Sequence, residues 1–285
     1  MTLPVHRLMV STPSRGHIPT RVFDNHKGFH SHLGVLTEQS RLLQQVLAGR
    51  LTMPEEPLAE LKAAVPEWLH GIRLEHDCFF TTSLLVPYAR ERIAESAVEM
   101  GFDEILWLDD DMLFDHSTLY ECMSVAKREH EVDILAARCH QRQYPYAPVL
   151  YNDVGSRSRI QKGDVQHLIQ TQEDFDYPPD QVVEYDMVGF GCVLMDLKIL
   201  TDLPKPWFMS TTACGEDIYF CWRARAIVGA KIAAHTGIEV GHLGEAPVIG
   251  EEYWLKYGKE GAVKQRAIND AKKAKELAEA AEATA

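Results

Sequence analysis

The stretch 104–114 (Glu-Ile-Leu-Trp-Leu-Asp-Asp-Asp-Met-Leu-Phe) constrains the fold of this chain more than any other. Its segment 105–108 contains no polar side chain, which is typical of a central parallel strand that is covered on both faces. The three aspartates that follow are therefore expected at the carboxyl end of a buried strand. In an open α/β sheet, ligands bind at this edge.

The aspartate triplet predicts a divalent metal site. Adjacent carboxylates repel one another, so a nearby cation would stabilise them. Side chains two residues apart on an extended chain point the same way, so Asp109 and Asp111 can converge on one ion. Carboxylate oxygens are preferred ligands of hard divalent cations. Asp110 points the other way and is expected to anchor the loop or to contact the bound ligand.

Strand-like and helix-like segments alternate through the first half of the chain. The strand-like runs are 7–12, 71–76, 104–108 and 132–137, and the helix-like segments are 37–50, 57–69, 87–100 and 117–128. Such alternation predicts an α/β fold with a mixed, mostly parallel sheet flanked by helices.

The second half of the chain differs in character. Residues 153–181 are polar and rich in turn residues, which indicates an insertion or mobile loop, or simply a solvated surface excursion. Two strand-like runs meet at Gly189-Phe190-Gly191, where the backbone is expected to approach a ligand or another strand closely. We expect one domain over residues 1–245 and a helical tail rich in Ala, Glu and Lys over 246–285.

The composition narrows the choice of protein class. A chain of 285 residues with 46% hydrophobic content can bury a substantial core. The formal charge of −13 disfavours long-range attraction to nucleic acid, although a local basic groove stays open. The six cysteines form no C-x-x-C pair, so reduced, cytoplasmic residence is expected. There is neither a signal peptide pattern nor a run of about 18 apolar residues.

Three sets of reactive side chains are expected at one edge of the sheet. Asp109 and Asp111, the Glu216-Asp217 pair and His242 all lie at the end of a predicted strand or at the start of a helix. Each has an ordinary alternative. A lone histidine is often structural, and an acidic pair at the start of a helix is stabilised by the helix dipole.

The motif order resembles the nucleotide-sugar-dependent glycosyltransferases of the GT-A (Rossmann-like) fold. The resemblance spans about residues 5–245, and its motifs lie at 106–112, 188–194, 215–218, 222–225 and 240–242. It implies that Asp111 is the principal metal ligand and that His242 completes the protein's share of the coordination. It also implies that Asp109 contacts the ribose, or the metal through water. The ion is expected to be Mn²⁺ or Mg²⁺, and an imidazole ligand favours Mn²⁺.

The same resemblance implies a nucleotide-binding role for the end of the first strand. Thr12, Pro13 and Arg15 match the loop that holds the nucleotide base, and Arg90 would face the nucleotide. Glu91 follows Arg90 where relatives often have Asn, which is a departure from the family pattern. Gly189 and Asp110 would contribute to the donor site, Asp110 through the donor sugar.

The implied reaction transfers a sugar from a nucleotide-diphosphate sugar, with UDP favoured, to an acceptor hydroxyl. The Glu216-Asp217 pair lies where the family addresses the acceptor. In an inverting enzyme Asp217 would be the general base. In a retaining enzyme the pair would bind the acceptor or the donor sugar instead.

The acceptor stays open between a glycan, a small molecule, a protein and a hydroxymethylated DNA base of the bacteriophage type. Trp207 could stack on a sugar or could simply be a hydrophobic plug. Arg142, in the turn 138–142, could form a phosphate-binding lip for DNA. The other basic residues of that lip would be Arg157, Arg159 and Lys162.

Two other classes of function remain. Nucleotidyl or phosphoryl transfer also uses carboxylates and a divalent ion, although the chain has no G-x-x-x-x-G-K-[ST] phosphate loop. The other class is a non-catalytic nucleotide- or carbohydrate-binding module.

Overall fold

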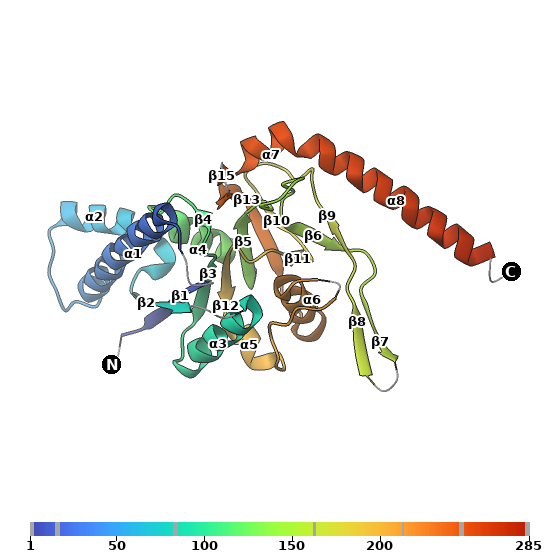
Figure 1. Cartoon of the computed structure of the whole chain (residues 1–285). Coiled ribbons are helices and arrows are strands. Elements are labelled where there is room, and N and C mark those ends of the chain that lie inside the picture. Colours follow the sequence, from blue (N-terminus) through green and yellow to red (C-terminus); the bar gives the residue numbers. More distant parts are fainter. Residues whose placement is uncertain are drawn as a thin grey trace.

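The computed structural model describes residues 3–14, 18–81, 85–161, 164–212, 214–244 and 248–282, and their side chains except those of 157–168, 273 and 276–282. A seven-stranded sheet forms the centre of these described residues (Figure 1). Its strands, in spatial order, are β10 (Val182–Glu184), β13 (Ile232–Glu239), β5 (Ile134–Arg138), β12 (Cys192–Asp196), β3 (Glu104–Leu108), β1 (Val5–Pro13) and β2 (Arg73–Thr81).

The sheet is mixed but mostly parallel. β1 pairs in parallel with β2 and β3, and β13 pairs in parallel with β5. β12 is antiparallel to both of its neighbours, β3 and β5, and β10 is antiparallel to β13. All strands except β12 and β10 therefore run in one direction, which confirms the α/β fold class predicted from the sequence.

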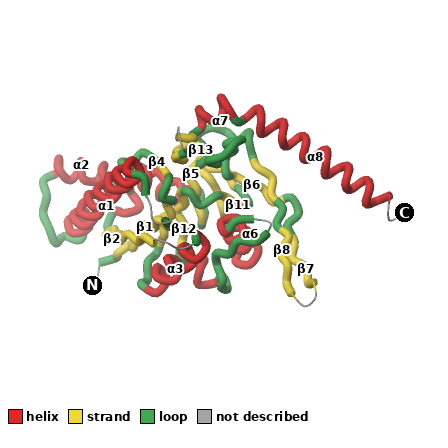
Figure 2. Tube along the Cα trace, viewed as in Figure 1, coloured by secondary structure: helices red, strands yellow, loops and turns green. Residues whose placement is uncertain are grey.

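Helices cover both faces of this sheet (Figure 2). One face carries α1 (Thr20–Leu47), α2 (Glu55–Ala64), the short η1 (Glu67–Leu69) and α4 (Leu119–Glu129). The other carries α3 (Val86–Glu99), α5 (Lys198–Asp202) and α6 (Glu216–Val228). Successive residues of a strand point to opposite faces. Ile105 and Trp107 accordingly pack in the cluster beneath α3, whereas Leu106 and Leu108 pack beneath α1.

The first helix differs from its prediction. The sequence indicates a helix over 37–50, but α1 begins at Thr20 and has 28 residues. Its early turns bury Val22, Phe29 and Leu33. The intervening histidines and glycines obscure this apolar stripe in the sequence.

Smaller sheets surround the central one. β11 (Met187–Val188), β6 (Leu150–Asp153) and β9 (Thr171–Glu173) form one, and β15 (Val248–Ile249), β14 (Gly241–Leu243) and β4 (Met112–Leu113) form another. The segment expected to be an insertion or loop contains β9 and the hairpin β7 (Arg157–Gln161) and β8 (Asp164–Leu168), which extends from the body (Figure 1).

The C-terminal segment is partly packed against the domain. α7 (Glu251–Tyr257) buries Trp254 in a cluster with Phe175, Ala147 and Ala262. α8 (Lys259–Glu282) then extends away from the body (Figure 1). The start of the segment predicted to be a tail is therefore anchored to the sheet domain.

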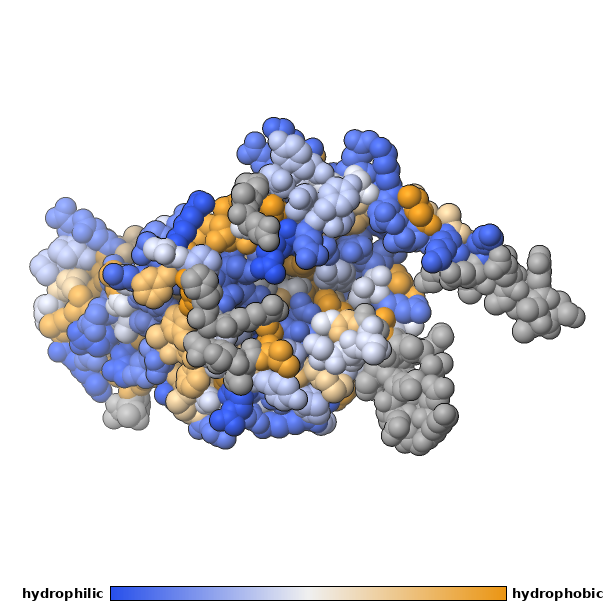
Figure 3. Space-filling view, in the orientation of Figure 1, coloured by the Kyte–Doolittle hydropathy of each residue, from blue (hydrophilic) through white to orange (hydrophobic). Residues whose placement is uncertain are grey.

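The visible surface is mainly hydrophilic, with small hydrophobic areas scattered over it (Figure 3). Among the residues described, no helix combines the length and apolar character that crossing a bilayer requires.

Candidate functional site

The reversed direction of β12 places an additional segment of the chain at one edge of the central sheet. β3 and β5 end at this edge, with Leu108 and Arg138. β12 lies between them and runs the opposite way, so it begins there, at Cys192. The residues before it, 189–191, therefore lie at the same edge as the aspartate triplet.

A pocket of about 350 Å³ opens at this edge. Its lining includes Asp109, Asp217, His242 and the segments 139–143 and 189–191. The structure thus brings together one residue from each of the three sets of reactive side chains that the sequence predicts at this edge.

Two glycines allow the backbone to come this close to its neighbours. A Cβ atom on Gly191 would lie 2.7 Å from the Cε atom of Met112, and one on Gly189 would lie 2.7 Å from a methyl carbon of Val149. Val149 is branched and its Cβ would also lie 2.8 Å away, so Gly189 leaves no room for a side chain, whereas at Gly191 the flexible end of Met112 would have to shift. The close approach predicted at these glycines is to neighbouring segments of the protein.

Asp111 meets His242 across the short pairing of β4 with β14. Met112 lies opposite His242 in this pairing, and the Leu243 amide donates to the carbonyl of Asp111 at 2.8 Å. As a result, His242 Nε2 lies 3.0 Å from Asp111 Oδ2. The same oxygen lies 3.1 Å from Arg142 Nη1.

The other ring nitrogen of His242 fixes its protonation pattern. Nδ1 lies 2.8 Å from the carbonyl oxygen of His140. A carbonyl only accepts, so Nδ1 carries a proton. In a neutral ring, Nε2 would then present a lone pair to the carboxylate of Asp111. A second proton or a cation is needed between these two atoms.

The charge of Asp111 affects the ionisation of this histidine. Burial lowers the pKa of His242, but the hydrogen bond to Asp111 and its negative charge outweigh this effect and raise the pKa above its ordinary value. The site therefore attracts positive charge to Nε2.

Asp109 has a different partner. Arg90 of α3 is 2% exposed. Its Nη2 donates to Asp109 Oδ1 at 2.8 Å, and its Nε donates to Glu216 Oε1 at 3.2 Å. Its guanidinium lies 5.4 Å from the ring centres of both Trp107 and Phe190. Within the described parts of the chain, the remaining nitrogen, Nη1, has no hydrogen-bond partner.

Burial changes the ionisation of this group of charges. It raises the pKa of Asp109 to about 6 even though Arg90 opposes the shift. The nearby charges of Asp111 and Glu216 raise it further. Of the neighbouring charges, Arg90 is the one that stabilises the charged form of Asp109.

Asp217 is the second residue of α6 and lies beside this group. Burial raises the pKa of Asp217 to about 6, and the charge of Glu216 contributes to the increase. A carboxylate in a pocket with a pKa near neutrality suits a general base.

The residues present fit a cation that is shared with a substrate. In the described part of the chain, no three His, Cys, Asp or Glu side chains are arranged to hold a metal ion by themselves. Asp111 and His242 supply one oxygen and one nitrogen that already face each other. Mg²⁺ in nucleotide enzymes is commonly held by one or two protein ligands together with substrate phosphates, and an imidazole nitrogen suits Mn²⁺.

The end of β1 lies near this edge and has unsatisfied hydroxyl groups. Pro13 is the last residue of the strand, and Thr12 is 1% exposed. Among the described residues, the Thr12 and Ser11 hydroxyls have no hydrogen-bond partner. Arg15 lies outside the described residues.

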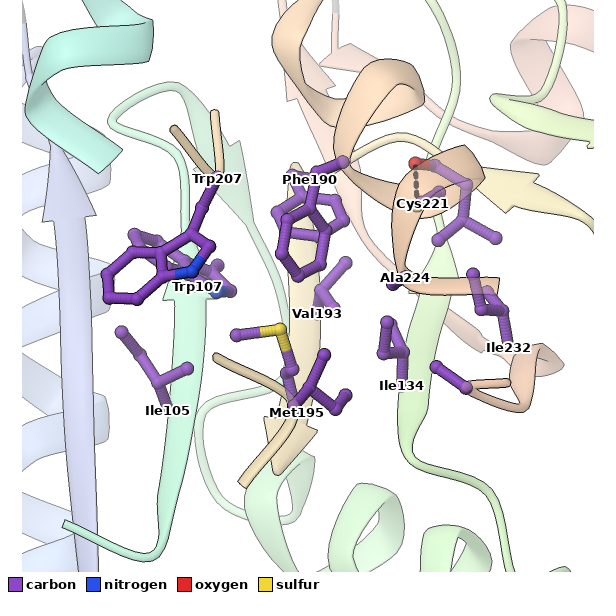
Figure 4. Close-up of a cluster of buried hydrophobic side chains, with 14 of the residues drawn as sticks. Ile105, Trp107, Ile134, Phe190, Val193, Met195, Trp207, Cys221, Ala224 and Ile232 are labelled. Carbon is purple, nitrogen blue, oxygen red and sulfur yellow. Dashed lines mark hydrogen bonds between the residues drawn. The ribbon is translucent and has the colours of Figure 1, made fainter. Parts of the chain in front are cut away.

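Other predicted residues lie away from the pocket lining. Trp207 is 4% exposed, packs in the core near Trp107 (Figure 4), and donates through Nε1 to the Leu203 carbonyl at 2.7 Å. Its position matches the hydrophobic plug rather than a sugar platform. Asp110 is not among the lining residues of this pocket. The side chains of Arg157, Arg159 and Lys162 lie outside the described part of the structure.

The Glu91 carboxylate makes contacts that account for an acidic residue at this position. Its carboxylate accepts the backbone N–H groups of Trp207 and Phe208, at 2.9 and 2.8 Å. The departure from the family pattern therefore attaches the loop before α6 to α3.

Sequence reasoning missed much of the segment 139–143 as pocket lining. Arg142, predicted as an acceptor contact, lines the pocket and pairs with Asp111. Cys139, His140, Gln141 and Gln143 also line the pocket. Their position directly after a buried strand at the ligand-binding edge was the available signal.

No protein-family model matches the chain, and no curated protein sequence matches it at a significant level. Among solved structures, A197 from STIV has a TM-score of 0.46 and 14% identity, covering 83% of this chain and 85% of that chain. An apo UDP-glucose pyrophosphorylase has a TM-score of 0.40 and 10% identity, covering 91% and 99%.

A third solved structure, S. aureus TarS 1-349, has a TM-score of 0.37 and 12% identity, and the match covers 81% of this chain and 58% of that one. Because all three TM-scores lie below 0.5, these likenesses give no information on the chemistry of the site.

Proposed function

We propose that the protein is a metal-dependent glycosyltransferase that transfers a sugar from a nucleotide-diphosphate sugar, with UDP favoured, to an acceptor hydroxyl. The observation that carries the proposal is the pairing of Asp111 Oδ2 with His242 Nε2 at 3.0 Å, in a pocket that Asp217 also lines. This pair needs a second proton or a cation between its atoms. We infer that a metal ion takes this place when the substrate is bound, with a diphosphate completing its coordination.

Asp111 and His242 would hold Mn²⁺ or Mg²⁺. When bound, the ion supplies a Lewis acid that neutralises the charge developing on the departing diphosphate. Asp109 would contact the ribose, or the metal through water. Arg90 holds Asp109 in place, and its buried Nη1, which has no hydrogen-bond partner among the described residues, would be a candidate donor to the nucleotide.

Asp217 would act as the general base of an inverting reaction. It takes the proton from the acceptor hydroxyl as that oxygen bonds to the anomeric carbon, while the bond between that carbon and the phosphate oxygen breaks. Glu216 is engaged with Arg90, so it positions the arginine and leaves Asp217 as the base. If the reaction retains configuration, the pair binds a sugar instead.

Thr12 and Pro13 at the end of β1 would adjoin the nucleotide base. The Thr12 and Ser11 hydroxyls, which are buried and lack partners among the described residues, would be candidate donors to its polar edge. Gly189 would allow the pocket wall to approach the donor, and Asp110 would contact the donor sugar or anchor its loop.

For the acceptor, a neutral hydroxyl compound such as a glycan is favoured over hydroxymethylated DNA. The net charge of −13 repels a polyanion. Arg142, which among the described basic residues of the proposed DNA-binding lip lines the pocket, is paired with Asp111. Sugar transfer to hydroxymethylated DNA at low salt would reverse this preference.

The decisive experiment combines binding with product analysis. Mass spectrometry of the nucleotide sugar retained by the protein with Mn²⁺ identifies the donor, and analysis of the products identifies the reaction. We expect a nucleoside diphosphate. Release of pyrophosphate would show nucleotidyl transfer, and tight sugar binding without turnover over many acceptors would indicate a binding module.

A further inference from the structure

The first turn of α7 holds the pocket segment 138–142 through one carboxylate. Glu251 Oε2 accepts the Tyr177 hydroxyl at 2.6 Å. The same oxygen lies 3.1 Å from His140 Nε2 and 3.5 Å from Arg138 Nε. Burial raises the pKa of Glu251, but these neighbours lower it more, which indicates that the carboxylate is charged.

His140 is enclosed by the same helix. Its side chain is 0% exposed, and its ring lies 5.6 Å from that of Trp254, centre to centre. The His140 ring is therefore enclosed between Glu251 and Trp254, with the carboxylate at ion-pair distance and no hydrogen bond to the ring nitrogens among the described residues. The carbonyl oxygen of His140 is the atom that accepts the Nδ1 proton of His242.

α7 is also joined to the strand that carries His242. Ile249 of β15 pairs with His242, and Glu251 begins the helix directly after Gly250. The Glu251 amide donates to Glu239 Oε1 at 2.6 Å, and Glu239 Oε2 lies 3.2 Å from Arg138 Nη2. The contacts therefore form a closed ring that runs through α7, segment 138–142 and β14.

We propose that Glu251 is a positioning residue, which fixes the His140 carbonyl and thereby holds His242 with its proton on Nδ1 and its Nε2 lone pair toward the cation site. The cation-binding part of this proposal rests on the proposed function. The orientation of His242 does not. Groups that orient a metal-ligating histidine affect metal affinity by about 10- to 100-fold.

The first test measures the Mn²⁺ dissociation constant from the signal of free Mn²⁺ in electron paramagnetic resonance. We expect Glu251→Ala to raise this constant about tenfold and Glu251→Gln, which keeps an acceptor for Tyr177, to raise it less. Glu252→Ala is the matched control, because it removes an exposed carboxylate from the same turn. We expect it to change the constant less than about twofold.

A merely structural role would lower the melting temperature of Glu251→Ala and leave its Mn²⁺ affinity below that temperature unchanged. That result would overturn the proposal. If Glu251→Ala does not fold, an unchanged Mn²⁺ affinity in both Glu251→Gln and Tyr177→Phe would also overturn the proposal.

The second test requires no metal. Long-range nitrogen NMR of the metal-free protein at alkaline pH reports which ring nitrogen of each histidine carries the proton, and a His242→Gln spectrum assigns the His242 signals. We expect the Nδ1–H form in the wild type and a mixture of forms in Glu251→Ala. Identical spectra would refute the positioning role. If the wild type binds no Mn²⁺ but the tautomer of His242 changes in Glu251→Ala, the proposed function fails and the positioning role of Glu251 stands.

Discussion

Asp109 and Asp111 belong to the same short motif, but the structure surrounds them differently. The partner of Asp109 is Arg90, whose side chain is 2% exposed, whereas the arginine beside Asp111 is Arg142, whose side chain is 50% exposed. Asp111 also faces His242, which Asp109 does not contact through any hydrogen bond among the described residues. Asp109 already has a buried cationic partner, so its pairing stabilises the fold. Asp111 faces a histidine nitrogen, an arrangement that suits a bound cation. Under the proposed function, this comparison makes Asp111 rather than Asp109 the expected principal metal ligand.

The strongest test of this comparison is Asp111→Asn. Loss of the carboxylate charge should remove metal-dependent UDP binding and lower kcat/KM by about 10³-fold, roughly 4 kcal/mol of transition-state stabilisation. Calorimetric titration of UDP with and without Mn²⁺ measures the effect. Asp110→Asn removes the adjacent charge and should cost far less. Metal-dependent affinity that survives in Asp111→Asn would contradict the assignment.

Replacing Arg90 tests the other half of the comparison. Arg90→Met would leave Asp109 and Glu216 without their buried partner, and removing one member of a buried ion pair costs about 3–5 kcal/mol. Urea unfolding measures the change. Arg92→Met, on the exposed side of the same helix, is the control and should be nearly neutral. Equal stabilities would mean that Arg90 is not needed to hold Asp109.

The proposed base gives a prediction about pH. Asp217→Asn should lower kcat by about 100-fold or more and leave UDP affinity intact. Because burial raises the pKa of Asp217 to about 6, the wild-type rate should fall as the pH drops below that value and the carboxylate takes up its proton. The rate should level off above it. A pH–rate profile of both proteins measures this. Because Asp109 also has a pKa raised to about 6, the deciding outcome is the loss of kcat at about pH 8, and an Asp217→Asn rate equal to that of the wild type there would assign the base elsewhere.

The smallest expected effect is that of Arg142→Met. An exposed ion pair contributes little, so the free energy of unfolding should change by less than about 1 kcal/mol. If Arg142 assists the diphosphate, UDP affinity with Mn²⁺ should fall about fivefold, roughly 1 kcal/mol. A loss of stability as large as that of Arg90→Met would remove the contrast between the two arginines.

The sequence predicts the elements of this site better than their contacts. The apolar run before the aspartates is the buried strand β3, and the α/β class is confirmed. Strand direction has no signature in the apolar pattern, so the reversal of β12 could not be predicted. The Arg90–Asp109 pair also could not be predicted, because it depends on how α3 packs against β3.

The segment 139–143 shows a second reason why part of the site was missed. The cysteine, histidine and glutamine residues of this segment match no motif. They line the pocket because the segment directly follows β5 at the edge where the pocket opens. Glu251 reaches this loop because Trp254 packs against the domain. The sequence does not indicate this packing, since most of the predicted tail is rich in alanine and charged residues.

The site also joins distant parts of the chain, with consequences for its synthesis. Asp111 and His242 are 131 positions apart, and Arg90 and Glu216 are 126 positions apart. Contacts between residues so far apart in sequence form slowly and late in folding. While the ribosome is still adding β14 and α7, a growing chain contains the aspartates but not their histidine. Under the proposed function, a partly made chain would therefore lack the histidine ligand of the cation until β14 has been added.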